Sequence, residues 1–219
     1  MFNRKIAYLF LVGLLVLALI LGWMLYDSFR LQALQIIFLD VGQGDAILIQ
    51  QGSSQVLIDG GRSGKQLLEK VGQYVPFWDR TIEVVVATHP DQDHIGGLVD
   101  LFDAYHVDSI MRTRDTSDSQ TFKAFVAATQ GADEIEAVRG AKIDFPAGAE
   151  SEVLYPFNSV VESNKNDSNS NSVVLRLTWG NNAFLFTGDL PSADENKLID
   201  NSVNIQANVL KVSHHGSRY

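Results

Sequence analysis

The chain has 219 residues, of which 46% are hydrophobic and 20% are charged, and its formal net charge is −9. These values are typical of one globular domain with an appendage, and they exclude a disordered or collagen-like chain. The acidic charge argues against a protein that depends on non-specific phosphate contacts. The absence of cysteine excludes disulfides, thiolate metal sites and a cysteine nucleophile.

The N-terminal segment is predicted to cross a membrane. Residues 6–26 carry no charged side chain, and as a helix they would span about 31 Å, which matches a bilayer core. Arg4 and Lys5 precede this segment, and positive flanks stay in the cytoplasm. We therefore expect a cytoplasmic tail over 1–5, a single-pass anchor in the lipid bilayer of the cell membrane over 6–26, and the remainder on the extracytoplasmic side.

Two other interpretations of residues 6–26 are open. A cleaved signal peptide would normally have an apolar region of about 7–15 residues and a small-residue cleavage site, whereas this segment is longer and ends in Gly-Trp-Met-Leu-Tyr-Asp. A buried core helix would need a large protein around it, because the segment is apolar on all sides.

A short linker over 27–33 is expected to lead into a sheet. Three runs rich in Ile, Leu and Val follow at 34–40, 46–50 and 55–59, with Gly and Asp between them. This pattern predicts an antiparallel opening. The Gly42-Gln43-Gly44 segment between the first two runs is expected to be a tight turn bordering a cleft.

Helices and strands then alternate along the chain. We predict helices over 66–74, 96–105 and 121–128, and a fourth from Pro191 through 198. Strands are predicted over 82–88, 107–111, 153–155, 173–179, 183–187 and 209–212, and the Ser- and Asn-rich segment 158–171 as a loop. Paired strands that alternate with helices indicate a mixed α/β sandwich.

The strongest chemical signal follows the predicted strand 82–88. His89, Asp91, Asp93 and His94 place four potential metal ligands within six residues. His89 and Asp91 can meet one ion, and Asp93 and His94 another. Imidazole and carboxylate together suit zinc, manganese or iron. The alternative is a solvated polar turn.

Two weaker signals also follow predicted strands, where sites are usually built. Asp189 comes after a strand expected to be buried, where a carboxylate is costly unless it is paired or coordinating; it can bridge two ions, and the alternative is a helix cap before Pro191. His214 and His215 follow the last strand. Adjacent side chains diverge, so we expect only one of the two to face the site, and a surface turn is the alternative.

Six segments, in this order, resemble the metallo-β-lactamase superfamily, and in particular the soluble hydrolase-like domain of ComEC competence proteins. They are FLDVGQGDAILI (38–49), LIDGG (57–61), THPDQDHIGGL (88–98), NSVVLRL (171–177), FLFTGDL (184–190) and LKVSHHGS (210–217). The resemblance implies an αββα sandwich over 34–219 with two divalent metal ions, zinc or manganese. It implies the ligands His89, Asp91, Asp93, His94 and a bridging Asp189, with Asp93 and His214 as catalytic residues and His214 either facing the substrate phosphate or supporting the site.

The chain departs from the wider superfamily at three points. Asp91 stands where the superfamily usually has His, which favours manganese somewhat. The segment before Asp189 has Asp167, Ser168, Asn169 and Asn171 but no His. The superfamily's last His ligand, beyond the HHGS segment, is also missing, so we expect a domain that is incomplete at the C-terminus. ComEC-like proteins look similar at the first two points.

The functional expectation is a membrane-anchored dinuclear-metal hydrolase. It would cleave phosphodiesters by attack of a metal-bound hydroxide, as a nuclease-like protein related to competence and DNA uptake. With Arg4 and Lys5 on the cytoplasmic side, the formal charge of the remainder falls from −9 to −11, which weighs mildly against polymeric DNA. The alternatives are hydrolysis of another small ester, a lactone or a cell-wall phosphodiester, and a non-catalytic DNA-uptake or envelope-binding module.

Overall fold

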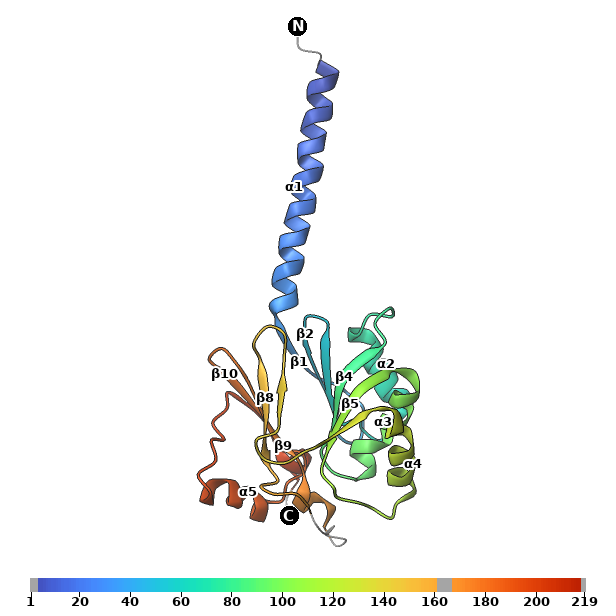
Figure 1. The fold of residues 1–219 in the computed structure, drawn as a ribbon, viewed down its shortest axis with the longest axis vertical. Coiled ribbons are helices and arrows are strands. Elements are labelled where there is room, and N and C mark those ends of the chain that lie inside the picture. The colour runs from blue at the N-terminus through green and yellow to red at the C-terminus, as the bar shows by residue number, and fades with distance from the viewer. Residues whose placement is uncertain (1–3, 161–166, 218–219) are drawn as a thin grey trace.

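The computed structural model describes residues 4–160 and 167–217. Helix α1 (Arg4–Gln32) leaves the rest of the chain as a long rod, and the residues after it form one domain at its C-terminal end (Figure 1). The middle of the predicted loop 158–171 lies outside the described residues, and its described end forms a 3₁₀ turn over Ser168–Asn171.

The first part of α1, Arg4–Tyr26, is long and apolar enough to cross a bilayer. None of its described side chains is buried by the domain. A buried core helix is therefore excluded, while a membrane span and a signal sequence both fit the helix. The expected linker 27–33 is helical as far as Gln32.

The first sheet has six strands in sequential order, and its first three are antiparallel as predicted. From the third strand onward the neighbours are parallel. The strands are β1 (Leu34–Phe38), β2 (Ile47–Gln51), β3 (Ser54–Ile58), β4 (Thr81–Ala87), β5 (His106–Arg112) and β6 (Asp133–Glu136). Its outer face packs against α2 (Gly64–Tyr74), α3 (Gln92–Ala104) and α4 (Gln120–Ala128).

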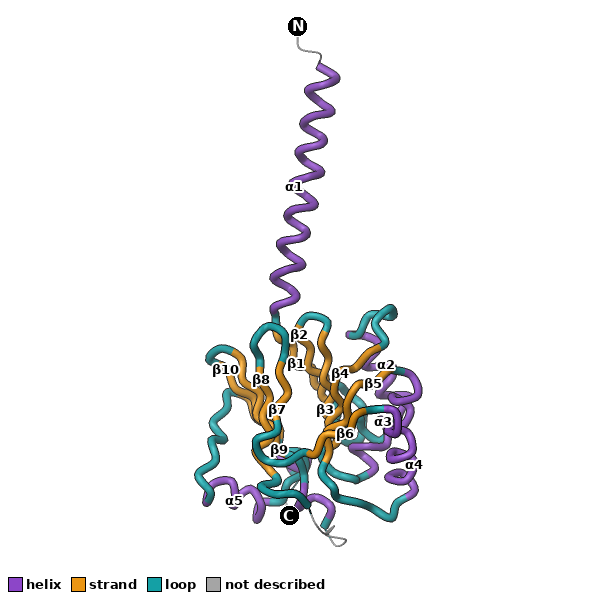
Figure 2. Tube along the Cα trace, viewed as in Figure 1, coloured by secondary structure: helices purple, strands orange, loops and turns teal. Residues whose placement is uncertain are grey.

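The second sheet has five strands in the order β11-β10-β9-β8-β7. Only the β10–β11 pair is parallel. The strands are β7 (Lys142–Asp144), β8 (Glu150–Tyr155), β9 (Val174–Trp179), β10 (Asn182–Phe186) and β11 (Val209–Lys211), and α5 (Ser192–Asp200) covers the outer face. Figure 2 shows the two groups of strands side by side, with the helices outside them.

Alternation along the strands builds the layers. In β2, Leu48 points to the helices, while Ile47 and Ile49 point between the sheets. In β3, Leu57 likewise points to the helices and Val56 points between the sheets. Successive strand residues face opposite sides of a sheet, so both faces of the central strands are apolar. These packed layers confirm the predicted αββα sandwich.

In the domain itself, the structure differs from the sequence predictions in the start of one helix and in two additional strands. Helix α3 begins at Gln92 rather than at residue 96, which places Asp93 and His94 in its first turn. Strands β6 and β7 were not predicted, because each is short and has a single large apolar side chain, Ile135 or Ile143. These strands form because they pair with β5 and β8, and their own sequences have no apolar pattern that predicts a strand.

Gly97 of α3 is expected to be essential for packing. A Cβ atom there would lie 2.0 Å from the carbonyl oxygen of Gly60, so we predict that Gly97→Ala lowers the free energy of unfolding by about 2–3 kcal/mol. Gly72→Ala on α2 is the matched control, because no atom lies within 4 Å of its Cβ position; it should be neutral or gain up to about 1 kcal/mol. Urea unfolding of the full chain in detergent, followed by near-UV circular dichroism, measures both, and equal stabilities would contradict the packing argument.

Candidate metal centre

The site lies where several strands end on one edge of the sandwich. The predicted motif begins directly after β4, with Thr88 and His89, and continues into the first turn of α3. Asp189 follows β10, and His214 and His215 follow β11. The fold therefore brings all three sequence signals to the same edge.

His94 is the most enclosed member of the motif. Its side chain is fully buried, and its Nδ1 lies 2.8 Å from Asp59 Oδ2. Asp59 also accepts hydrogen bonds from the backbone N–H and the hydroxyl of Thr88, at 2.8 and 2.7 Å. Its own backbone is left-handed, with φ 57°. Asp59 thus fixes the ring of His94 and directs Nε2 toward Asp189 Oδ2, 3.3 Å away.

The environment of His94 favours positive charge. Burial disfavours the protonated ring, but the carboxylates of Asp59 and Asp189 outweigh this and raise the pKa of His94 to about 10. Burial likewise disfavours the charged form of Asp189, yet contact with His94 holds the pKa of Asp189 below its usual range. A cation at this point is therefore stabilised by the chain, whether it is a proton or a metal ion.

His89 is buried beside His94, with ring centroids 4.0 Å apart. Its Nδ1 lies 3.0 Å from the hydroxyl of Thr88, and its Nε2 lies 3.8 Å from Asp91 Oδ2. Burial lowers the pKa of His89 to about 3, so the ring is neutral near pH 7. Neutral imidazole is the form that binds metals.

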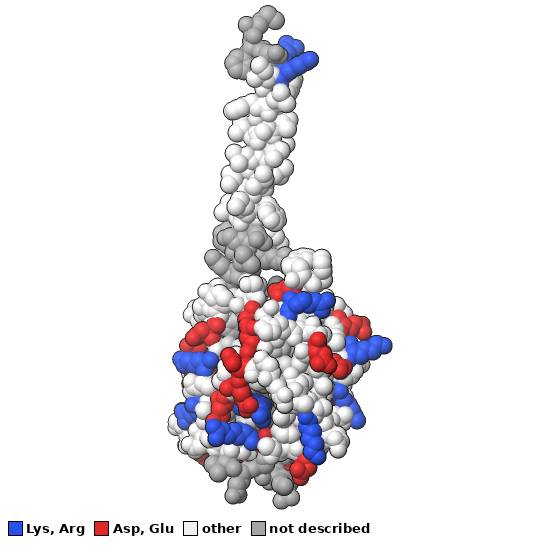
Figure 3. Space-filling model, turned by 45° about the vertical axis from the view of Figure 1, so that its right-hand side comes forward, with Lys and Arg blue, Asp and Glu red and all other residues white. Residues whose placement is uncertain are grey.

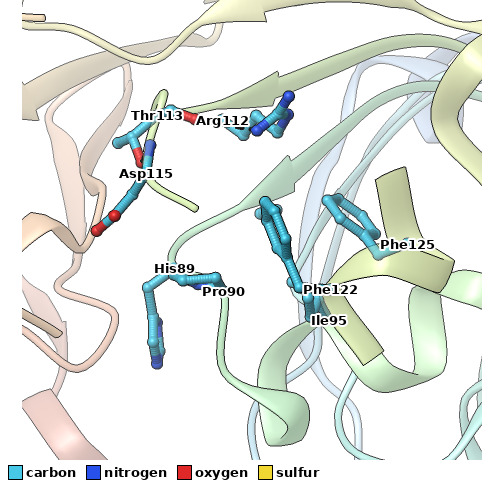
Figure 4. Close-up of a pocket in the computed structure, with 9 residues that line it drawn as sticks. His89, Pro90, Ile95, Arg112, Thr113, Asp115, Phe122 and Phe125 are labelled. Atoms are coloured by element: carbon cyan, nitrogen blue, oxygen red, sulfur yellow. Dashed lines mark hydrogen bonds between the residues drawn. The ribbon is translucent and has the colours of Figure 1, made fainter. Parts of the chain in front are cut away.

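Figure 4 shows His89 and the carboxylate of Asp115 directed away from the rings of Phe122 and Phe125. Asp115 is buried and accepts a hydrogen bond from Asn171 at 2.9 Å. The phenyl rings belong to the core under α4 and line a small cavity together with His89.

Asp189 is the carboxylate with the most contacts in the site. Besides His94, it lies near His214 Nδ1 (3.6 Å), His215 Nε2 (3.4 Å) and Lys211 Nζ (3.3 Å). The helix-cap alternative does not hold, since the N-cap of α5 is Pro191. Lys211 is 9% exposed; it also contacts Asp45 and donates to the carbonyl of Gly188 at 2.7 Å.

Both adjacent histidines face the site, which corrects the prediction that only one would. His214 and His215 have φ values of 48° and 51°. Two consecutive left-handed residues turn the chain sharply, so their side chains do not diverge as they would in an extended segment. His215 reaches Asp45 Oδ1 at 3.3 Å and Asp93 Oδ2 at 3.9 Å.

The other two motif carboxylates lie at the more open side. Asp91 is 41% exposed, and its Oδ1 accepts a hydrogen bond from Ser168 at 2.6 Å. Asp93 is 26% exposed and faces His215. The Gly42-Gln43-Gly44 turn borders the site as predicted, because a Cβ at Gly44 would lie 1.6 Å from the carbonyl oxygen of Asp93.

The donor atoms fit a divalent metal. Ligand atoms of Asp45, His94, Asp189 and His215 all lie within 4.8 Å of one another. The Nε2 atoms of His89 and His94 are both buried: that of His89 has no hydrogen-bond partner, that of His94 faces Asp189 Oδ2, and each Nδ1 is held by a neighbouring oxygen. This is the arrangement in which an imidazole offers its second nitrogen to a metal. Mixed nitrogen and carboxylate donors suit zinc, manganese or iron.

The predicted residues therefore gather at one place, and the structure adds four that were not assigned. Those are Asp45, Asp59, Lys211 and His215. Asp45 and Asp59 stand in two of the segments that carry the family resemblance, each beside a glycine. An acidic residue next to a glycine at one end of a strand was the available signal for both: Asp45 shortly precedes β2, and Asp59 directly follows β3.

Comparisons with known proteins agree with this geometry. A family model described as "Metallo-beta-lactamase superfamily" matches residues 39–219. The chain is 30% identical to ComE operon protein 3 of Bacillus subtilis (strain 168), over 82% of this chain and 25% of that protein. It is 28% identical to Recombination protein 2 of Haemophilus influenzae, over 84% of this chain and 21% of that protein. The chain thus spans about a quarter or less of the length of these relatives, and they confirm the ComEC-like resemblance.

Solved structures confirm the fold. Rm3 metallo-beta-lactamase aligns with a TM-score of 0.53 and 12% identity, over 79% of this chain and 72% of its own. MEM-A1, a subclass B3 metallo-beta-lactamase from a soil metagenome library, aligns with a TM-score of 0.54 and 14% identity, over 82% of this chain and 75% of its own. At these identities the likeness concerns the fold alone.

Asp59→Asn is predicted to weaken metal binding without unfolding the chain. The amide keeps the shape of the side chain but loses the charge that orients His94 and makes its ring more basic. The affinity for zinc or manganese should fall by about 10- to 100-fold, measured by competition with a chelating dye. Asp103→Asn, at an exposed position on α3, is the matched control and should bind as the wild type does. Unchanged affinity in Asp59→Asn would show that this carboxylate does not support the metal centre.

Proposed function

The chain belongs to the metallo-beta-lactamase superfamily, and we propose that it is a metal-dependent hydrolase of phosphodiesters, held at the outer face of the cell membrane by α1. One observation supports this proposal most strongly. Two buried histidines, His89 and His94, each have Nδ1 held by a neighbouring oxygen and Nε2 turned toward a carboxylate, that of Asp91 or Asp189. Imidazoles oriented in this way beside carboxylates offer a metal both nitrogen and oxygen donors.

We assign the metal ligands as two neighbouring groups. His89 and Asp91 form one, and His94 and Asp93 form the other, with Asp189 between them. Asp45 and His215 extend the second group, since they share its cluster of ligand atoms. Two divalent ions held here would lower the pKa of a water molecule and neutralise charge on a phosphoryl group.

Other side chains act on the substrate in this proposal. His214 is 29% exposed, and its Nδ1 lies 3.3 Å from Asn169 Nδ2 and 3.6 Å from Asp189 Oδ2. These neighbours hold the ring at the rim of the site, where it can donate a proton to the phosphoryl oxygen or to the leaving group. Asp93 is open enough to hold the attacking water as well as to serve as a ligand. Lys211 contacts acceptors on three sides and serves as a counter-ion in the site.

The substrate class rests on analogy and on the site's chemistry. The matched relatives are named for the ComE operon and for recombination, which favours a DNA-related phosphodiester. Against polymeric DNA, acidic and basic side chains are interspersed on the face shown in Figure 3, and the chain is acidic overall. A cell-wall phosphodiester, a small ester or lactone, and a non-catalytic DNA or envelope module are therefore the competing outcomes of the test.

The catalytic proposal predicts that metal and activity are lost together. The full chain, loaded with manganese or zinc in detergent, should hydrolyse bis(p-nitrophenyl) phosphate. Asp189→Asn should lower kcat by at least about 100-fold and lower the metal content measured by mass spectrometry, because Asp189 contacts His94 and His215 and in this proposal would bridge the two groups of ligands. His214→Gln should lower kcat while the metal content stays unchanged. His106→Gln is the matched control, since His106 is exposed at the start of β5.

Three results would contradict the proposal. Full activity with normal metal content in Asp189→Asn would remove this residue from the site. Hydrolysis of p-nitrophenyl acetate or a lactone, with no cleavage of the phosphodiester or of DNA, would move the substrate class to carboxylic esters. A metal-loaded chain that cleaves none of these but binds DNA would favour the non-catalytic module.

The membrane proposal predicts which side of the membrane carries the domain. Arg4 and Lys5 flank the helix on the short side, so the domain should face outward. The chain has no cysteine, so Ala193→Cys on the exposed surface of α5 provides a unique label. It should react with a membrane-impermeant maleimide in intact cells, while Asn3→Cys should react only after permeabilisation. Release of the labelled chain from the membrane by an alkaline wash would indicate a cleaved signal peptide instead.

A further inference from the structure

The loop between α2 and β4 exposes a pair of large aromatic side chains. Phe77 is 80% exposed and Trp78 is 75% exposed, more than any other large hydrophobic side chain described in the domain. Their rings contact each other edge to face, with centroids 4.8 Å apart. Tyr74, at the end of α2, is 47% exposed and lines the same cavity as Trp78. An exposed apolar patch of this kind marks an interaction surface.

This loop is held in place by its own contacts. Val75 is buried under α2. The carboxylate of Asp79 accepts hydrogen bonds from Gln55 Nε2 of β3 at 2.9 Å and from the backbone N–H of Thr81 at 3.3 Å. The aromatic pair is therefore presented outward by a fixed backbone.

Sheet topology places the loop at the end of the domain that α1 enters. Strand β1 begins at Leu34, directly after α1, and Leu34 pairs with Gln51, next to the β2–β3 turn. Strand β4 runs parallel to β3, so the loop that leads into β4 lies at the same edge as that turn. A cavity of about 400 Å³ joins these parts and is lined by Ala33, Gly52, Tyr74 and Trp78 among others. Figure 1 shows the same arrangement, with this loop and α1 at one end of the domain.

The length of α1 sets how far this end lies from the hydrocarbon. The apolar span ends at Tyr26, and the helix continues for six residues to Gln32. Six helical residues rise about 9 Å, whereas the headgroup layer on each side of a bilayer is roughly 5–8 Å thick. Residue 33 and its neighbours around the cavity therefore lie just outside the headgroup layer, within reach of it for the long aromatic side chains of the loop.

We propose that Tyr74, Phe77 and Trp78 insert into the interfacial layer of the bilayer that α1 spans, so that the domain docks on the membrane surface. This inference rests on the proposed membrane anchor. Tyr and Trp rings are favoured at this depth because one end of the ring is apolar and the other is polar. A second contact beside α1 limits rotation of the domain about the helix and fixes the sheet edge with the loop toward the lipid.

Docking would also set the direction of the candidate metal centre. The site follows the C-terminal ends of β3 and β4, and the aromatic loop, which leads into β4, lies at the edge formed by their N-terminal ends. Strands of five and seven residues separate the two edges by roughly 17–23 Å. The site therefore opens away from the lipid, where an external substrate can reach it.

Spin labels on single cysteines test the docking, because the natural chain has none. The full chain would be labelled at Phe77→Cys, at Ala193→Cys on α5 and at Leu15→Cys in the middle of α1, and placed in phosphatidylcholine vesicles. Collision rates with oxygen, which concentrates in lipid, and with a water-soluble nickel complex then give the depth of each label. We expect an oxygen-to-nickel ratio at Phe77→Cys at least about threefold above that at Ala193→Cys, and the highest ratio at Leu15→Cys.

The outcomes separate docking from anchoring. A lipid-exposed label at Leu15→Cys with a water-exposed label at Phe77→Cys would overturn docking and leave the anchor standing. A water-exposed label at Leu15→Cys would overturn both. Spin–spin broadening at Phe77→Cys that disappears on dilution with unlabelled chain would also overturn the proposal, because it would identify a second copy of the chain as the partner of this surface.

Discussion

The buried contact between Asp59 and His94 is the constraint on which the site depends. Asp59 directly follows β3, Thr88 directly follows β4 and His94 lies in the first turn of α3, so a single carboxylate joins three segments. A buried carboxylate is costly unless all of its partners are in place. The close approach of α3 follows from this need, and Gly97 permits it beside the carbonyl of Gly60. The packing of α3 against the sheet and the orientation of His94 thus depend on the same group, the carboxylate of Asp59.

The balance of charge explains why the site can form around so many acidic groups. Asp45 and Asp189 are mostly buried and face each other across Lys211, whose ammonium also meets the carbonyl of Gly188. This fixed cation neutralises the side of the site that β10 and β11 build. On the other side, His94 lies between the carboxylates of Asp59 and Asp189, which favour a positive charge on its ring. Lys211 therefore balances part of the acidic charge of the site, and the proposed divalent ions would balance the rest.

The sequence was sufficient for the fold and for most of the site, because both depend on local patterns. Apolar strand runs identify the central strands, and four ligand-type residues within six identify the motif after β4. Asp45 and Lys211 were missed because their roles arise from a contact between the loop that follows β1 and the last strand, β11, which are far apart in the sequence. His215 was missed because its direction depends on an uncommon left-handed backbone. Strands β6 and β7 were missed because their neighbours, and not their own composition, make them strands.

Strand direction links the two ends of the domain. Because β3, β4 and β5 run parallel, the loops that follow them gather at one edge and the loops that precede them gather at the other. The chain enters the sheet from α1 at the second edge, so any group that follows a parallel strand is carried away from the anchor. An antiparallel arrangement of the same strands would return half of these loops toward the anchor. Parallel pairing therefore gathers the ligands into one site and, with α1 as its membrane anchor, would keep that site clear of the lipid surface.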